Sequence, residues 1–143
     1  MGRASRVLTK SPAETAEAGR RLASSLGPGS VVCLYGGLGA GKTVFVKGLA
    51  SALGIEPRDV ISASFTIIAE YPSVPPLYHA DLYRLEPGDD LEECGLLDLM
   101  YGRGITVIEW ADRLPEEETA GAVKVHINLV SEDLREIIID GDE

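Results

Sequence analysis

The strongest constraint on this chain is the stretch from Val31 to Thr43, where an apolar run leads into a glycine-rich loop and then directly into a helical pattern. The loop, residues 36–43, has the form Gly-x-x-x-x-Gly-Lys-Thr. Glycines let successive backbone N–H groups turn inward around a phosphate chain, and the following helix directs its positive N-terminal end at the same place. A strand, such a loop and a helix in this order predict a site for the phosphates of a nucleotide.

The residues of this loop have separate expected contacts. Lys42 is expected to reach the β- and γ-phosphates, and the hydroxyl of Thr43 to join a Mg²⁺ shell. An accidental glycine-rich turn is the alternative, which the flanking strand and helix disfavour. The backbone expected to surround the phosphates comprises Gly36, Gly37, Leu38, Gly39, Ala40 and Gly41.

Bulk properties narrow the class of protein. We expect residues 1–143 to form a single domain with a sizeable core. The hydrophobic content of 45% is typical of a soluble chain, and no apolar run reaches membrane-spanning length. The first residues lead into no signal-peptide core, so a cytoplasmic location is expected. Cys33 and Cys94 show no zinc spacing.

The formal net charge of −10 argues against unaided wrapping of a nucleic-acid backbone, which needs clustered Lys and Arg. Acidic residues are concentrated at 86–93 and 116–118. Such runs are either solvated faces or docking surfaces for a basic partner. Any contact with nucleic acid is therefore expected to be shared with other proteins.

Hydrophobic periodicity predicts an α/β fold. A helix is expected to start with Ser11 as N-cap, Pro12 at its first position and Glu14 closing a capping box, and to run through Leu26. Strands joined directly by turns cannot all be parallel, so we predict a P-loop NTPase-like three-layer fold with a mixed β-sheet and a C-terminal hairpin. The other expected elements are strands at 5–8, 31–35, 60–71 (kinked near 62–64), 77–83, 105–110, 123–130 and 134–139, a helix from 44 to a C-cap at 54, and one or two short helices within 89–101.

A phosphate loop usually works with an acidic group at the end of a neighbouring strand, which holds Mg²⁺ directly or through water. Two residues qualify. Glu109 ends an apolar run, whereas Asp81 lies in a more polar strand. A triphosphate is normally bound as its magnesium complex, so at least one acid is expected to serve. An exposed strand-end acid is the alternative for each.

Four further side chains are candidates for the site. His79 shares a face with Asp81 and is either a hydrogen-bonded structural residue or a general base. Trp110 is either a core aromatic or a wall of the site. Ser64 and Thr66 either reach the γ-phosphate as part of a switch loop or are ordinary strand hydroxyls.

Taken together, these motifs resemble the bacterial TsaE family (also called YjeE), the small P-loop ATPases of tRNA threonylcarbamoyladenosine synthesis. The resemblance runs nearly end to end, and its ordered motifs are much more specific than a phosphate loop alone. They are Leu-Gly-Ala-Gly-Lys-Thr at 38–43, Ser-Ala-Ser-Phe-Thr at 62–66, Glu-Tyr at 70–71, His-Ala-Asp-Leu-Tyr-Arg at 79–84 and Ile-Glu-Trp at 108–110.

The resemblance implies a Mg²⁺-dependent ATPase that works with the TsaB and TsaD proteins. TsaD transfers a threonylcarbamoyl group to the adenosine beside the anticodon, and TsaE-like ATP turnover is thought to reset that complex between cycles. The resemblance, together with the absence of an Asn-Lys-x-Asp guanine signature, favours ATP. The isolated protein is expected to be a monomer with weak turnover, activated by its partners.

The resemblance also assigns roles to individual residues. It places the phosphates on Gly39 to Lys42 and the Mg²⁺ on Thr43 and Glu109, with Asp81 positioning water or supporting the metal site. The remaining assignments are Ser64 and Thr66 in a switch-like segment, and Ser11 and Arg135 flanking the adenine.

This chain departs from the family pattern at three places. The family usually has Asp where this chain has Gly37, Ser-Pro-Thr at 62–64 where this chain has Ser-Ala-Ser, and an aromatic residue at the position of Ala80. The second difference is expected to loosen the switch-like segment, and the third to change the packing beside Asp81. None removes a phosphate or metal ligand.

Two other functions fit a phosphate loop. A small-molecule kinase generally needs an acceptor pocket and an arginine-bearing lid. Here Arg84, Arg103 and Arg113 are scattered, and the sequence has no lid-like insertion. A nucleotide-gated binding module, in which hydrolysis is incidental, is the other alternative.

Overall fold

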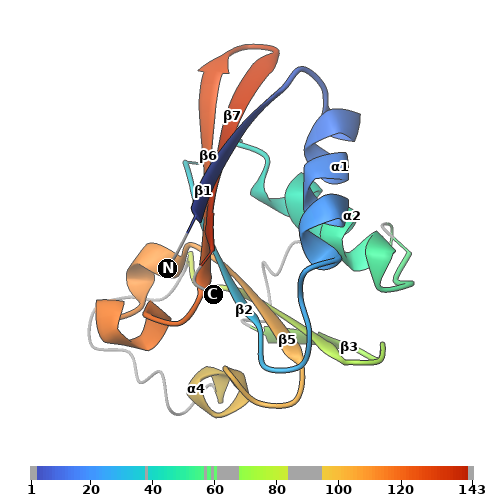
Figure 1. Cartoon of the computed structure of the whole chain (residues 1–143), viewed down its shortest axis with the longest axis vertical. Helices are drawn as coiled ribbons and strands as arrows, with labels where there is room; N and C mark the ends of the chain where they lie inside the picture. Colours follow the sequence, from blue (N-terminus) through green and yellow to red (C-terminus); the bar gives the residue numbers. More distant parts are fainter. Residues whose placement is uncertain are drawn as a thin grey trace.

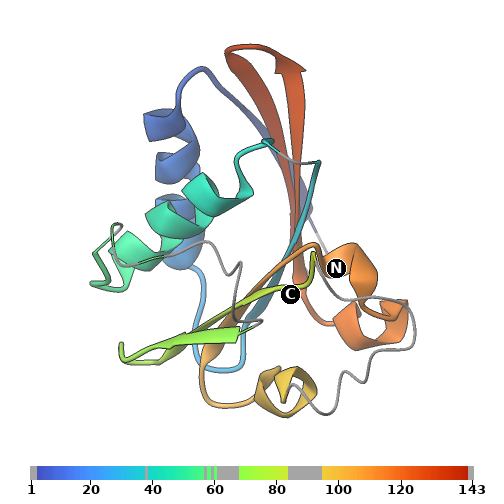
Figure 2. The same ribbon diagram turned by 180° about the vertical axis from the view of Figure 1, so that it is seen from behind.

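The structure, a computed structural model, describes residues 3–37, 39–56, 58, 60, 68–83 and 95–141. Within these residues, one mixed sheet has the strand order β1-β7-β6-β2-β5-β4-β3 (Figures 1 and 2). The elements are β1 (Arg3–Thr9), α1 (Pro12–Ala23), β2 (Val31–Tyr35), α2 (Lys42–Ala52), β3 (Ile68–Tyr71), β4 (Leu77–Asp81), α4 (Leu96–Leu99), β5 (Ile105–Glu109), the 3₁₀ turns η2 (Ala111–Arg113) and η3 (Glu116–Thr119), β6 (Val123–Ser131) and β7 (Leu134–Gly141).

The centre of the sheet is parallel and its edges are antiparallel. Strand β2 pairs in parallel with β5 and β6, and β5 pairs in parallel with β4. The pairs β3–β4, β6–β7 and β1–β7 are antiparallel. Every residue of β5 and the first four of β2 are buried, as the continuous apolar runs of central parallel strands require. The predicted mixed sheet and C-terminal hairpin are confirmed.

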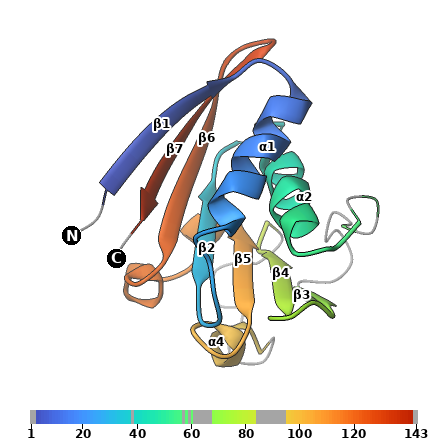
Figure 3. The same ribbon diagram turned by 45° about the vertical axis from the view of Figure 1, so that its right-hand side comes forward.

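Helical layers cover both faces of the sheet. Helices α1 and α2 lie on one face (Figure 3), and their core joins Phe45 and Leu49 to Leu34 and Val107 of the strands. On the other face, Leu96 and the residues around η2 pack on a second core. No helix within the described parts of the chain has the length and apolar character needed to cross a membrane.

Two glycines let the backbones of α1 and α2 meet closely. A Cβ atom added to Gly48 would lie 1.8 Å from the carbonyl oxygen of Ala16, and one added to Gly19 would lie 2.2 Å from that of Phe45. Neither distance is sterically allowed. Because α2 begins at Lys42, this packing also positions the end of the glycine-rich loop.

The first helix is shorter than predicted. It ends at Ala23, and the next turns are tightened by bonds from Ser25 N–H to the Leu22 carbonyl and from Leu26 N–H to that of Ala23. The Ser24 hydroxyl also donates to a carbonyl one turn back, that of Arg21, at 2.8 Å. Serine side chains bonded to local carbonyls compete with the helical ladder, which explains the early end.

Two predicted strands also end early. Strand β4 stops at Asp81, whose carboxylate accepts the Tyr83 N–H at 2.9 Å and turns the chain. Strand β5 stops at Glu109, because Trp110 has a left-handed backbone with φ of 57°. Of the strand predicted at 60–71, Ile68–Tyr71 is observed and 61–67 lies outside the described residues. Of the acidic helices, α4 is observed and 84–94 lies outside them.

Candidate nucleotide and metal site

The glycine-rich loop lies at the carboxyl end of β2, and three of its glycines, Gly36, Gly39 and Gly41, have positive φ values that other residues rarely adopt. Gly36 has a φ of 154°, and a Cβ atom there would lie 2.5 Å from the carbonyl oxygen of Ile127. Gly41 has a φ of 108° and forms the N-cap of α2. The loop conformation therefore depends on glycine at both ends of the Gly-x-x-x-x-Gly pattern.

The start of α2 presents backbone amides to the loop. The Phe45 N–H donates to the Gly41 carbonyl at 3.0 Å and begins the helical ladder. The amides of residues 42–44 precede this bond and have no acceptor within the helix. Such amides, together with the helix dipole, make a helix N-terminus a favourable place for phosphate oxygens.

Lys42 is held across this loop. Its Nζ donates to the carbonyl oxygens of Gly36 at 2.7 Å and Gly37 at 2.8 Å, and lies 4.3 Å from the centre of the Trp110 ring. The side chain is buried, and burial lowers the pKa of Lys42, while the nearby carboxylate of Glu109 acts in the opposite direction. Gly37 contacts Lys42 through its backbone carbonyl, which an aspartate at this position would also have. The glycine found here in place of the family's Asp therefore removes none of these contacts.

Trp110 contacts both the second core and the lysine of the glycine-rich loop. It packs against the second core, and its ring covers the Lys42 ammonium in a cation–π contact. The exposed ring of Tyr83 lies 4.9 Å from it at an angle of 46°. A left-handed backbone is costly for a bulky residue, and such strain is concentrated at functional sites.

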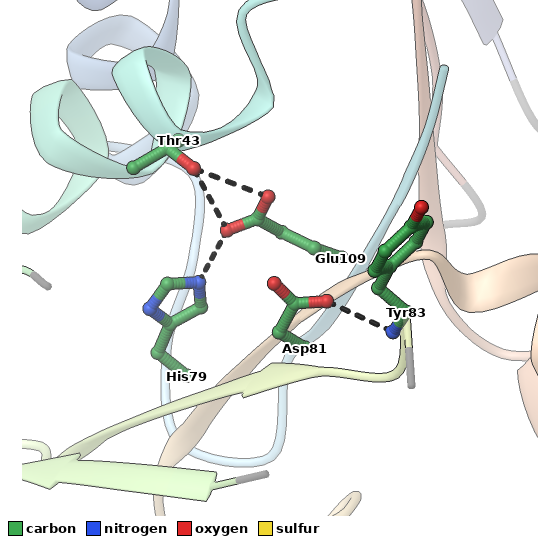
Figure 4. Close-up of polar contacts among 5 residues, drawn as sticks. All are labelled: Thr43, His79, Asp81, Tyr83 and Glu109. Carbon is green, nitrogen blue, oxygen red and sulfur yellow. Dashed lines mark hydrogen bonds and ion pairs between the residues drawn. The ribbon is translucent and has the colours of Figure 1, made fainter. Parts of the chain in front are cut away.

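The hydroxyl of Thr43 faces the carboxylate of Glu109. Thr43 Oγ1 lies 3.3 Å from both Oε1 and Oε2 of Glu109, which is 3% exposed. Figure 4 shows the carboxylate between this hydroxyl and the ring of His79. The loop and the end of β5, 66 residues apart, thus meet at one point.

His79 is hydrogen-bonded, and its partner is Glu109. Nε2 of His79 lies 2.7 Å from Oε2 of Glu109, and the imidazole is 0% exposed. Its other nitrogen, Nδ1, has no hydrogen-bond partner within the described part of the chain. Full burial removes the ring from the water that a general base would have to reach.

Asp81 lies beside Glu109 on the neighbouring strand. The two residues are paired in register between β4 and β5 (Figure 4). Burial raises the pKa of Asp81, the Tyr83 N–H lowers it, and the charge of Glu109 raises it further. Ala80, the third departure from the family pattern, points to the opposite face and is buried in the second core.

The residues present fit a magnesium ion. Thr43 and Glu109 supply the oxygen ligands that Mg²⁺ prefers. Adjacent ligands in its octahedral shell lie about 3 Å apart, given metal–oxygen distances of about 2.1 Å. The separation of 3.3 Å is close to that value and longer than the usual hydroxyl hydrogen bond of about 2.7 Å.

Arg135 reaches the loop from the C-terminal hairpin. Its Nε donates to the Ala40 carbonyl at 3.0 Å and its Nη2 to the Gly39 carbonyl at 3.3 Å. Ser11 has a structural contact of its own, since its hydroxyl accepts the Glu14 N–H at 3.1 Å as the predicted N-cap.

The structure thus gathers most of the predicted site at the loop and at the ends of β4 and β5. The Trp110 contact with Lys42 and the bond between His79 and Glu109 were not identified from sequence, although each residue was a candidate. Leu38, Ser64 and Thr66 lie outside the described residues.

The fold and the loop define an α/β protein of the P-loop NTPase-like class. Residues 9–137 match the family model described as "Threonylcarbamoyl adenosine biosynthesis protein TsaE". The chain belongs to the TsaE family, which confirms the resemblance inferred from its motifs.

Individual relatives agree with this assignment. The tRNA threonylcarbamoyladenosine biosynthesis protein TsaE of Treponema pallidum is 40% identical over 134 residues, covering 94% of this chain and 98% of the relative. The protein of the same name from Bacillus subtilis is 43% identical over 130 residues, covering 90% of this chain and 80% of the relative. The crystal structure of Bacillus subtilis YdiB superposes with a TM-score of 0.76 at 36% identity, covering 99% of this chain and 87% of that one.

Proposed function

We propose that this chain is a magnesium-dependent ATPase of tRNA threonylcarbamoyladenosine biosynthesis, activated by TsaB and TsaD. The observation that carries the proposal is the Thr43 hydroxyl facing both carboxylate oxygens of Glu109 beside the glycine-rich loop. Membership of the TsaE family, whose model is named for this biosynthesis, supports the pathway.

Each residue of the site has a part in this proposal. The amides of residues 39–42 hold the phosphates, and Lys42 neutralises their charge. Thr43 and Glu109 hold Mg²⁺, which when bound polarises the phosphoryl oxygens and neutralises developing charge. Asp81, beside Glu109, positions the attacking water.

Partner activation is proposed because, among the described residues, few groups are available to hold that water. Glu109 is engaged by His79 and Thr43, which leaves Asp81 as the neighbouring carboxylate. A single group orients a nucleophile poorly, since positioning supplies much of the rate in phosphoryl transfer. TsaB and TsaD are therefore proposed to complete the site. Contact with tRNA is proposed to be made chiefly by these partners, because this chain carries a net charge of −10.

Phosphate release from ATP tests this proposal. Wild-type protein, Glu109→Gln and the control Glu117→Gln, at an exposed acid of η3, are assayed with Mg²⁺, alone and with TsaB and TsaD. We expect slow wild-type turnover that rises with the partners, its loss in Glu109→Gln and its retention in Glu117→Gln.

Three outcomes contradict parts of the proposal. Metal-dependent turnover that persists in Glu109→Gln removes the role of this acid. A turnover rate that TsaB and TsaD leave unchanged contradicts the proposed partnership. A phosphorylated nucleoside or metabolite, found in place of free phosphate, makes the protein a kinase.

A further inference from the structure

His79 occupies the boundary between the apolar core and the polar site. On the face of the sheet that α2 covers, the paired residues of β4 and β5 change from apolar to acidic along the strands. In register, these pairs are Leu77 with Ile105, His79 with Val107, and Asp81 with Glu109. The imidazole therefore lies two residues before Asp81 on β4, between a pair of hydrophobic residues and the pair of carboxylates.

The hydrogen bonding of the ring is one-sided. Nε2 is 2.7 Å from Oε2 of Glu109, whereas Nδ1 has no partner within the described part of the chain. A carboxylate only accepts hydrogen bonds, so Nε2 must carry the hydrogen and donate it. A buried imidazole nitrogen without a partner is costly, and among the described residues the hydrogen bond to Glu109 is the contact that distinguishes this ring from an apolar core residue.

This bond restricts the orientation of the Glu109 carboxylate. The terminal torsion of glutamate is broad, so an unsupported carboxylate samples many rotations. Here Oε2 accepts a hydrogen bond from Nε2 of His79, and both carboxylate oxygens lie 3.3 Å from Oγ1 of Thr43. The buried ring thus keeps the carboxylate directed at the hydroxyl at the start of α2.

We propose that His79 is a positioning residue that orients Glu109 to bind Mg²⁺, an inference that rests on the proposed magnesium–nucleotide site. It acts through Glu109 and touches neither nucleotide nor metal. Partners that orient metal ligands by hydrogen bonding typically change metal affinity by roughly 10- to 100-fold when they are removed. A purely structural histidine would instead affect stability and all ligands alike.

Calorimetric titration with ADP, in EDTA and at increasing MgCl₂, separates the two roles. His79→Leu removes the donor while filling the core position, and His79→Gln keeps an N–H donor. His126→Leu is the matched control, because His126 is the other histidine, is exposed, and stacks on Tyr35 at 4.7 Å.

We expect His79→Leu to lower the Mg²⁺ affinity of the ADP-bound protein roughly 10- to 100-fold. Its ADP affinity in EDTA should stay within about twofold of wild type, since no phosphate-binding group changes. His79→Gln should recover most of the Mg²⁺ affinity, and His126→Leu should match wild type.

Nitrogen NMR of the wild-type protein supplies a second test that does not depend on a variant folding. The two histidines give separable imidazole signals. We expect His79 to carry its hydrogen on Nε2, with Nδ1 bare, and expect the Nε2 signal to move when MgCl₂ is added to the ADP complex. A neutral ring with its hydrogen on Nδ1 and none on Nε2 overturns the proposal, and so does an Nε2 signal that does not change when MgCl₂ is added.

The calorimetric outcomes are equally distinct. Wild-type ADP affinity that is the same in MgCl₂ and EDTA overturns both this inference and the proposed magnesium site. A normal wild-type dependence that His79→Leu retains overturns only the positioning role. Equal losses of ADP affinity with and without Mg²⁺ in His79→Leu also overturn it, because they indicate a structural role.

Discussion

Replacing Gly48 by alanine should separate the helices that position the phosphate loop. The added methyl carbon would lie 1.8 Å from the Ala16 carbonyl oxygen and 2.7 Å from the Ala16 Cα. Even favourable contacts between carbon and a carbonyl oxygen are about 3.3 Å long. The helices must therefore move apart by about 1.5 Å, because the obstacle is backbone and cannot rotate away.

The expected cost follows from two opposed effects. Alanine in a helix interior is favoured over glycine by about 0.5–1 kcal/mol. Overpacking costs about 1–3 kcal/mol, and a clash with backbone belongs at the upper end. The net expectation is a destabilisation of about 2 kcal/mol, or a decrease in Tm of roughly 6 °C for a domain of this size.

Urea unfolding followed by circular dichroism measures this difference. Gly27→Ala is the control, because a Cβ atom there meets nothing within 4 Å and no positive φ is required. Gly19→Ala should behave like Gly48→Ala, since its Cβ would lie 2.2 Å from the Phe45 carbonyl oxygen. A Gly48→Ala protein as stable as Gly27→Ala would refute this account of the helix packing.

Three further changes have defined expectations. Asp81→Asn should stabilise the nucleotide-free protein at pH 7 while lowering turnover. Burial and the Glu109 charge raise the pKa of Asp81 in the folded state, so this carboxylate makes the protein less stable once the pH rises above the pKa of the unfolded chain. Burial raises the pKa of Cys33 from 9.0 to about 11, so the unfolded chain loses this proton first. This thiol should lower the free energy of unfolding by about 1.4 kcal/mol per pH unit between those values, and Cys33→Ala should remove that contribution in urea titrations. Arg135→Lys should weaken ATP binding roughly fivefold by calorimetry, because a lysine cannot span both the Gly39 and Ala40 carbonyls and loses about 1 kcal/mol of loop preorganisation.

Each of these expectations has a contrary result. A less stable Asp81→Asn protein would mean that the carboxylate is favourable in the empty site. If Cys33→Ala leaves the alkaline decrease in the free energy of unfolding unchanged, that decrease belongs to other groups. One such group is Tyr35, whose pKa is raised by burial to about 12. Unchanged ATP affinity in Arg135→Lys would make its contacts incidental to binding.

The parts of the site that depend on local sequence were predictable. The glycine pattern sets the loop because Gly36 and Gly41 adopt positive φ values that other residues resist. The apolar run before Glu109 predicts a buried central strand, and an acid at the end of such a strand emerges beside the loop.

The remaining contacts depend on strand order and on irregular backbone, which no local pattern encodes. His79 meets Glu109 because β4 and β5 are neighbours in parallel register, although 30 residues separate them. Trp110 reaches Lys42 only because its left-handed backbone ends β5. A glycine in a helix, such as Gly48, does not reveal which partner approaches it.

We propose that Thr43 and Glu109 hold one metal ion on a bound adenine nucleotide. A crystal grown with a non-hydrolysable ATP analogue and Mn²⁺ would decide this, because anomalous scattering locates the manganese independently of the protein. We expect one manganese bound to Thr43 Oγ1 and linked to the Glu109 carboxylate directly or through one water. A manganese on the nucleotide that neither residue reaches, or a nucleotide outside the glycine-rich loop, would contradict it.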